Sequence, residues 1–108
     1  MALPNRFTPT MGSVTIGTSA QSIYSLLSAI FTNVHKHSCS VQIQLDTTAS
    51  GVTCYVGNSN VASNMCGANL SAGQSTTLYG FDSNILNLDQ IYLLGSGSGQ
   101  VNIITNTR

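Results

Sequence analysis

The densest group of chemically reactive side chains in the sequence is His35-Lys36-His37-Ser38-Cys39. Alternate residues of a β-strand share one face, so His35, His37 and Cys39 could direct two imidazoles and one thiolate at a zinc ion. A structural zinc site needs a fourth ligand, and the sequence identifies none. The spacing also departs from the usual paired Cys and His motifs. We therefore favour a polar hairpin tip at His35 and His37, with Cys39 opening a buried face, and predict neither a metal site nor a cofactor site.

The groups needed for acid-base or nucleophilic catalysis are scarce. Glu is absent, and Asp82 and Asp89 stand beside asparagines, a context in which Asp commonly caps turns. Glycoside hydrolysis uses paired carboxylates, and the serines are not accompanied by a G-x-S-x-G nucleophile elbow. The run Gly95-Ser96-Gly97-Ser98-Gly99 lacks the Lys and the following helix of a phosphate loop. We predict that the chain has no catalytic residue and is not an enzyme.

Charge is the most unusual property of the composition. Only six of the 108 residues are charged, for a formal net charge of zero, whereas Ser, Thr, Asn and Gln together supply 43. Nucleic acids and anionic membrane surfaces require clustered Lys and Arg, so we predict that neither is a partner. A neutral surface also lacks the self-repulsion that keeps monomers apart, which suggests burial in an assembly. The charged residues are Arg6, Lys36, Asp46, Asp82, Asp89 and Arg108.

Two further features bear on the cellular location. The first ten residues lack the apolar segment of a signal peptide, and the apolar run Leu26–Phe31 is too short to span a bilayer. The cysteines, Cys39, Cys54 and Cys66, are odd in number, unlike a secreted disulfide scaffold. We expect a chain made in the cytoplasm, with reduced thiols.

The sequence predicts that the segments containing these residues are mostly β-strands. The length suits one domain, and Pro4 and Pro9 indicate an extended N-terminal arm over residues 1–12, followed by a domain over residues 13–108. Apolar and polar residues alternate most clearly from Cys39 to Asp46, the pattern of a half-buried strand. Short apolar stretches recur with turn residues between them, which predicts an all-β fold, a small antiparallel β-sandwich that is jelly-roll-like. Further strands are expected at residues 13–18, 52–56, 74–79, 90–94 and 100–105.

The segment from Ser19 to Phe31 admits two interpretations. Its apolar residues fit the stripe of a helix, with Ser19 as N-cap. The surrounding strands favour two short strands, Gln21–Ser25 and Ser28–Val34, and we prefer this interpretation while leaving the helix open. The glycines of residues 95–99 predict a hairpin return between the last two strands.

Three motifs in the second half of the chain resemble a type of small structural protein of tailed bacteriophages. The first is Tyr55-Val56-Gly57-Asn58-Ser59-Asn60-Val61, of the form Y-V-G-x-S-x-V. The second, Leu70-Ser71-Ala72-Gly73-Gln74-Ser75, has the form L-x-x-G-x-S, and the third, Leu88-Asp89-Gln90-Ile91-Tyr92, has the form L-D-x-I-Y. These residues are turns and packing positions rather than catalytic groups.

The resemblance implies a virion structural protein, and specifically a capsid decoration or cement protein. Its implied partners are the major capsid protein of the phage and further copies of itself, in a homo-oligomer expected to be a trimer, and its implied location is the virion. The arm would reach a neighbouring subunit. The alternative is a tail, neck or fibre module that binds surface sugars through Tyr and Asn. Tyr24, Tyr55, Tyr79 and Tyr92 are scattered one to a predicted strand, which fits sheet packing better than a binding platform.

Overall fold

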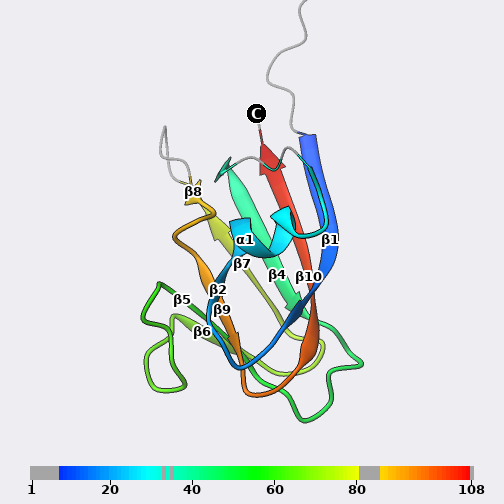
Figure 1. Ribbon diagram of the computed structural model, residues 1–108, viewed down its shortest axis with the longest axis vertical. Helices are drawn as coiled ribbons and strands as arrows, with labels where there is room; N and C mark the ends of the chain where they lie inside the picture. The colour runs from blue at the N-terminus through cyan, green and yellow to red at the C-terminus, as the bar shows by residue number, and fades with distance from the viewer. Residues whose placement is uncertain (1–7, 33, 35, 81–85, 108) are drawn as a thin grey trace, which may run out of the picture.

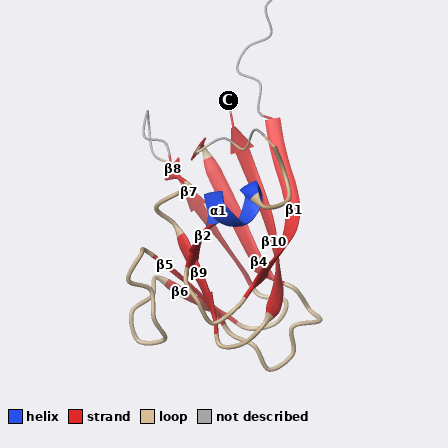
Figure 2. Ribbon diagram, viewed as in Figure 1, coloured by secondary structure: helices blue, strands red, loops and turns tan. Residues whose placement is uncertain are grey.

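The computed structural model describes residues 8–32, 34, 36–80 and 86–107, and these form a sandwich of two β-sheets with one short helix (Figure 1). Strands account for nearly all the regular structure (Figure 2). The elements in chain order are β1 (Thr8–Ile16), β2 (Gln21–Ser22), α1 (Ile23–Ser28), β3 (His37–Ser38), β4 (Ser40–Leu45), β5 (Cys54–Gly57), β6 (Ala68–Leu70), β7 (Ser75–Tyr79), β8 (Leu86–Asn87), β9 (Tyr92–Gly95) and β10 (Gly99–Thr107).

The order of the strands is that of a jelly roll. Sheet A has the order β1-β10-β4-β7, and sheet B has the order β2-β9-β5-β6. Every pairing is antiparallel, and a short ladder joins β3 to β8. The chain passes from one of these sheets to the other six times, between β1 and β2, β2 and β4, β4 and β5, β6 and β7, β7 and β9, and β9 and β10, as double-sheet jelly rolls do. The expected all-β, jelly-roll-like antiparallel sandwich is confirmed.

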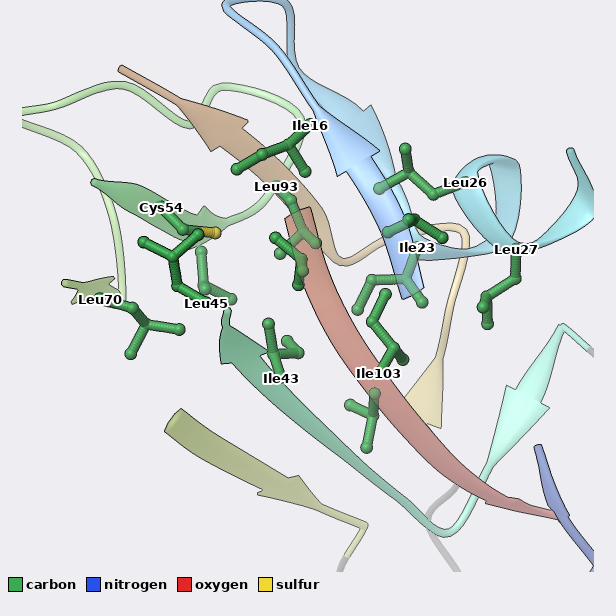
Figure 3. Packing of buried hydrophobic residues seen from close by; sticks show 14 of the residues in the cluster. Ile16, Ile23, Leu26, Leu27, Ile43, Leu45, Cys54, Leu70, Leu93 and Ile103 are labelled. Atoms are coloured by element: carbon green, nitrogen blue, oxygen red, sulfur yellow. The ribbon is translucent and has the colours of Figure 1, made fainter. Parts of the chain in front are cut away.

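The core lies between the sheets because the inward residues of each strand are apolar. In β4, Val41, Ile43 and Leu45 are fully buried, while Gln42 between them is exposed. Figure 3 shows Ile43 and Leu45 among the buried side chains of both sheets. Alternation of this kind fixes the register, since a slip of one residue would exchange the two faces.

The first strand begins earlier than the sequence indicated. β1 starts at Thr8 and pairs without interruption with β10, from Thr8 opposite Thr107 to Ile16 opposite Gly99. Residues 8–12, expected in the arm, therefore belong to sheet A, whereas residues 1–7 lie outside the described residues. Pro9 did not end the strand, because β1 is an edge strand and a proline is tolerated where its nitrogen faces away from the ladder.

The preferred interpretation of residues 19–31 as two strands is wrong for most of the segment. Only Gln21–Ser22 forms a strand, and α1 follows over Ile23–Ser28. The helix is capped by Ser22 rather than Ser19: the hydroxyl of Ser22 accepts a hydrogen bond from the backbone N–H of Ser25 at 3.1 Å. The helix closes the sandwich because Ile23, Leu26 and Leu27 project from one face into the core.

The glycine-rich segment is a crossover between sheets and not the expected hairpin. β9 belongs to sheet B and β10 to sheet A, so residues 95–99 carry the chain across the end of the sandwich. The crossover is held by the backbone N–H of Ser96, which donates to the carbonyl oxygen of Thr53 at 2.9 Å, and by the Ser96 hydroxyl, which accepts from the N–H of Thr53 at 2.8 Å.

Candidate interaction surface

The outer face of sheet A is a broad surface of uncharged polar side chains. The pairing registers place Ser13, Asn102, Gln44 and Ser75 in one row across the four strands, and Met11, Ile104, Gln42 and Thr77 in the next. These side chains alternate with the buried ones and so face solvent. We refer to these eight residues, with Thr15, Gln100, Asp46 and Tyr79, as the outer face of sheet A.

The polar side chains of this face are joined by hydrogen bonds across three strands. Ser13 Oγ donates to Asn102 Oδ1 at 2.7 Å, and Asn102 Nδ2 donates to Gln44 Oε1 at 3.2 Å and to Asp46 Oδ1 at 3.0 Å. Gln44 Nε2 in turn donates to the carbonyl oxygen of Gly73 at 3.3 Å. Mutual hydrogen bonding of this kind fixes side chains before any partner arrives, and so reduces the entropy lost on binding.

Asp46 is the single ionisable carboxylate of this surface. The pKa of Asp46 lies below its ordinary value, first because the Thr48 side chain donates to the carboxylate, and then because Asn102 and the Thr48 backbone also donate. Hydrogen bonds to the charged form favour ionisation. Both oxygens of the carboxylate therefore already accept hydrogen bonds from within the chain, Oδ1 from the amide of Asn102 and Oδ2 from Thr48.

Large apolar side chains are exposed on the same sheet, toward the end at which β1 begins and β10 ends. Met11 is 62% exposed, Ile104 beside it on β10 is 37% exposed, and Tyr79 at the end of β7 is 63% exposed. Apolar side chains surrounded by neutral hydrogen-bonding groups are typical of surfaces that become buried against another protein. The alternation of Gln100, Asn102, Ile104 and Asn106 in the sequence could have indicated this face. Met11 could not be predicted to lie on it, because Met11 was assigned from the sequence to the N-terminal arm.

A shallow apolar groove opens where β7 and β6, at the edges of their sheets, face each other. Its volume is about 250 Å³, and no lining residue carries an ionisable group. Such a groove can accept an apolar group. It is lined by Val56, Gly57, Gly67, Ala68, Thr76, Leu78 and Ile91.

The residues weighed as zinc ligands are only partly described. His35 lies outside the described residues. His37 is exposed in β3, opposite Asn87, and Cys39 is half-buried just before β4, where its N–H donates to the carbonyl oxygen of Asn106 at 2.8 Å. Within the described part of the chain, no group of three or more His, Cys, Asp or Glu side chains could hold a metal ion.

The structure also places some of the other ionisable and aromatic side chains considered above. Asp89 is in the turn that follows β8, and Asp82 is outside the described residues. The Nζ of Lys36 lies 5.4 Å from the ring centre of Tyr24, a cation–π contact. Two tyrosines do share a surface: Tyr55 pairs with Leu94, one diagonal step from Tyr92, on the outer face of sheet B.

Among the described residues, no helix is long and apolar enough to cross a membrane. No family model matches the sequence, and no curated protein matches it either.

One solved structure is similar over most of its length. That structure carries the description "Bacillus endospore appendages form a novel family of disulfide-linked pili". The alignment covers 98% of this chain and 93% of that chain, with a TM-score of 0.35 and 12% sequence identity. Similarity at this level identifies neither a family nor a function.

Proposed function

We propose that this protein is a structural component of a bacteriophage virion, a capsid decoration or cement protein that binds as a homo-oligomer between subunits of the assembled head. The observation that carries the proposal is the outer face of sheet A, which combines ordered neutral hydrogen-bonding groups with exposed Met11, Ile104 and Tyr79. The three motifs that resemble phage structural proteins give the choice of partner, the major capsid protein.

The scarcity of charge supports binding through this face. Burying an unpaired charge is costly, because hydration must be removed from it, and the outer face of sheet A carries only Asp46, which already has hydrogen-bond partners. Amides and hydroxyls can exchange their water contacts for partner groups at much lower cost. Many copies bound to a lattice would add avidity to a modest single contact.

The arm has a defined place in this proposal. Residues 1–7 precede β1 directly, and β1 is an edge strand of sheet A beside its outer face. We propose that residues 1–7 contact a neighbouring capsid subunit. Deleting them leaves β1 whole, whereas deleting residues 1–12 would also remove half of β1 and weaken the fold.

The decisive experiment is cosedimentation of the purified protein with isolated heads of the phage that encodes it, alongside unassembled capsid protein. We expect binding to heads only, and we expect deletion of residues 1–7 to reduce it at least tenfold without changing the melting temperature. Gln42→Lys, which introduces a charge at the exposed centre of the outer face of sheet A, should also abolish binding. Asn69→Lys on sheet B is the matched control. Undiminished binding by the deletion and by Gln42→Lys would refute the proposal.

A second candidate, a tail or fibre module that binds surface sugar, draws on sheet B. Tyr55, Tyr92 and the exposed Asn69 lie near one another on its outer face, since Tyr55 pairs with Leu94 on one side and Asn69 on the other. Aromatic faces beside an amide are suited to sugar rings. Binding to a glycan array that Asn69→Lys abolishes, without binding to heads, would favour this candidate.

A further inference from the structure

The outward edge of β1 carries a regular series of backbone hydrogen-bonding groups. In an antiparallel ladder, alternate residues bond to opposite neighbours. The N–H of Asp46 donates to the carbonyl oxygen of Gln100 at 2.9 Å, so the even-numbered residues of β10 bond to β4 and the odd-numbered ones to β1. Opposite those odd-numbered residues stand Gly12, Val14 and Ile16. The N–H and C=O groups of Met11, Ser13 and Thr15 therefore point away from sheet A.

Within the described residues, this edge has one of the features that normally prevent strands from pairing between molecules, a proline near its N-terminal end. Natural edge strands are protected by charged side chains, by bulges or by a covering segment. The register of β1 with β10 is continuous over nine residues, and residues 8–16 include no charged side chain. Among the described residues, no backbone hydrogen bond reaches the outward groups of Met11, Ser13 or Thr15. Pro9 lies on the same outward series and limits the pairing at its N-terminal end.

Exposed apolar side chains flank this edge on both sides. On the outer face, Met11 and Ile104 are exposed. On the inner side, Ile30 (49% exposed) and Phe31 (37% exposed) follow α1 and lie against Gly12, where a Cβ atom would be 2.7 Å from Phe31 Cε2. Six large apolar side chains are exposed in the described part of the chain, and four of them thus surround the first half of β1.

The distribution of charge indicates which kind of strand would pair with the outward edge of β1. No residue between Phe7 and His35, or between Asp89 and Arg108, is charged, so β1 and its neighbours β10 and α1 are entirely neutral. A partner with a charged strand would gain no ion pair here, whereas a second copy of this chain brings the same neutral and partly apolar edge. Like charges are then not brought together, and no charge is desolvated.

We propose that β1 pairs antiparallel with β1 of a second copy, about a twofold axis at Ser13. Met11 then faces Thr15 of the second copy, Ser13 faces Ser13, and the outward N–H and C=O groups satisfy one another. Sheet A becomes one continuous sheet across two copies, and Met11 and Ile104 stay on its outer face. A twofold contact of this kind is isologous and gives a dimer, whereas a trimer requires two different surfaces. The pairing concerns self-association and does not depend on the capsid.

The test measures the molar mass of the full chain in solution by light scattering coupled to size-exclusion chromatography. It compares the wild type with two variants that place opposite charges at Ser13. The wild type should have twice the chain mass of 11.3 kDa. Ser13→Lys places two lysines directly opposite each other, which is unfavourable for paired strands, and should give the monomer mass. Ser13→Asp should do the same. An equimolar mixture of the two variants should return to the dimer mass, because each Lys then faces an Asp.

Two controls separate this contact from loss of folding. Ser13→Ala removes the same hydrogen bond to Asn102 without adding charge, and should remain a dimer. Thr77→Lys puts a lysine at an exposed position of β7, the opposite edge of sheet A, and should also remain a dimer. A monomeric or trimeric wild type would overturn the proposal, and so would a Ser13→Lys variant that stays dimeric. Binding to heads is measured separately by cosedimentation; a monomeric wild type would contradict the homo-oligomer in that proposal, and a trimer would not.

Discussion

The backbones of Gly17 and Gly95 are in direct contact, because the N–H of Gly95 donates to the carbonyl oxygen of Gly17 at 2.8 Å. This bond ties the chain just after β1 to the end of β9, where the glycine-rich crossover begins. A Cβ atom at Gly95 would lie 3.1 Å from that same oxygen and 3.0 Å from Ile16 Cδ1, and would clash with the carbonyl oxygen of Gly97. A side chain at Gly95 is thus excluded by backbone atoms on two sides.

Gly95→Ala should therefore lower the free energy of unfolding by about 2–3 kcal/mol, as overpacking in a closely packed site does. Gly17→Ala is the matched control, because nothing lies within 4 Å of its Cβ position, and its effect should be within about 0.5 kcal/mol. Urea denaturation followed by circular dichroism measures both. Equal stability of the two variants would show that the crossover can shift to accept a side chain.

The pKa of Asp46 should respond to its two side-chain donors in a defined order. Thr48→Val removes the side-chain hydrogen bond that lowers the pKa most, so it should raise the pKa of Asp46 more than Asn102→Ala does. Because the folded-state pKa is below the unfolded value, the contribution of Asp46 to stability is present above the unfolded value. That contribution is lost as pH falls through the folded-state pKa. Carboxyl chemical shifts during an acid titration provide the measurement, and an unchanged pKa in Thr48→Val would contradict the assignment.

The thiols should differ sharply in reactivity. Burial raises the pKa of Cys54 to about 11, whereas Cys39 and Cys66 are half-buried. At pH 8 we expect an alkylating reagent to modify Cys39 and Cys66 well before Cys54, because the thiolate is the nucleophile. Peptide mass spectrometry locates the label, and chain unfolded in urea, in which all three should react alike, is the control.

The same shift has a consequence for stability. The raised pKa of Cys54 means that its contribution is fully present below the unfolded-state pKa of the thiol and is lost as pH rises through about 11. Cys54→Ala should remove this part of the alkaline loss of stability. Identical alkaline unfolding curves for the two chains would contradict it.

The cap of α1 offers a fifth prediction. Ser22→Ala removes the hydroxyl that accepts from the N–H of Ser25, and should cost about 1 kcal/mol of unfolding free energy. Ser25→Ala keeps the backbone donor and alters only an exposed side chain, so it should cost less than about 0.5 kcal/mol. Thermal denaturation distinguishes them, and a Ser22→Ala variant as stable as wild type would show that the hydrogen bond contributes nothing.

The sequence predicted the jelly roll well where one strand face is buried. β4 is the clearest case, since Val41, Ile43 and Leu45 alternate with polar residues, and period-two alternation has no helical counterpart. The prediction from sequence failed where tertiary packing decided between a helical pattern and a strand pattern. Residues 23–28 carry a helical stripe, and we set it aside for the strands around it, although α1 is stabilised by the core that Ile23 and Leu27 complete.

The crossover at residues 95–99 and the outer face of sheet A could not be predicted from the pattern of any single strand, for a different reason. Residues 95–99 have the composition of a hairpin turn, and only the sheet membership of β9 and β10 shows that they pass between sheets. The outer face of sheet A depends likewise on pairing between residues far apart, such as Met11 with Ile104. The local sequence of a strand does not indicate which other strands will be its neighbours in the sheet.

The central position of β10 in sheet A constrains when the protein can fold. β10 lies between β1 and β4 and pairs with both, yet it comes after every other strand in the chain. Until residues 99–107 have left the ribosome, β1 has no neighbour in its sheet and β4 has only β7. Contacts so distant in sequence also make folding slow. Sheet A therefore cannot be completed until the end of β10 has been synthesised, and we expect the nascent chain to depend on chaperones during that interval.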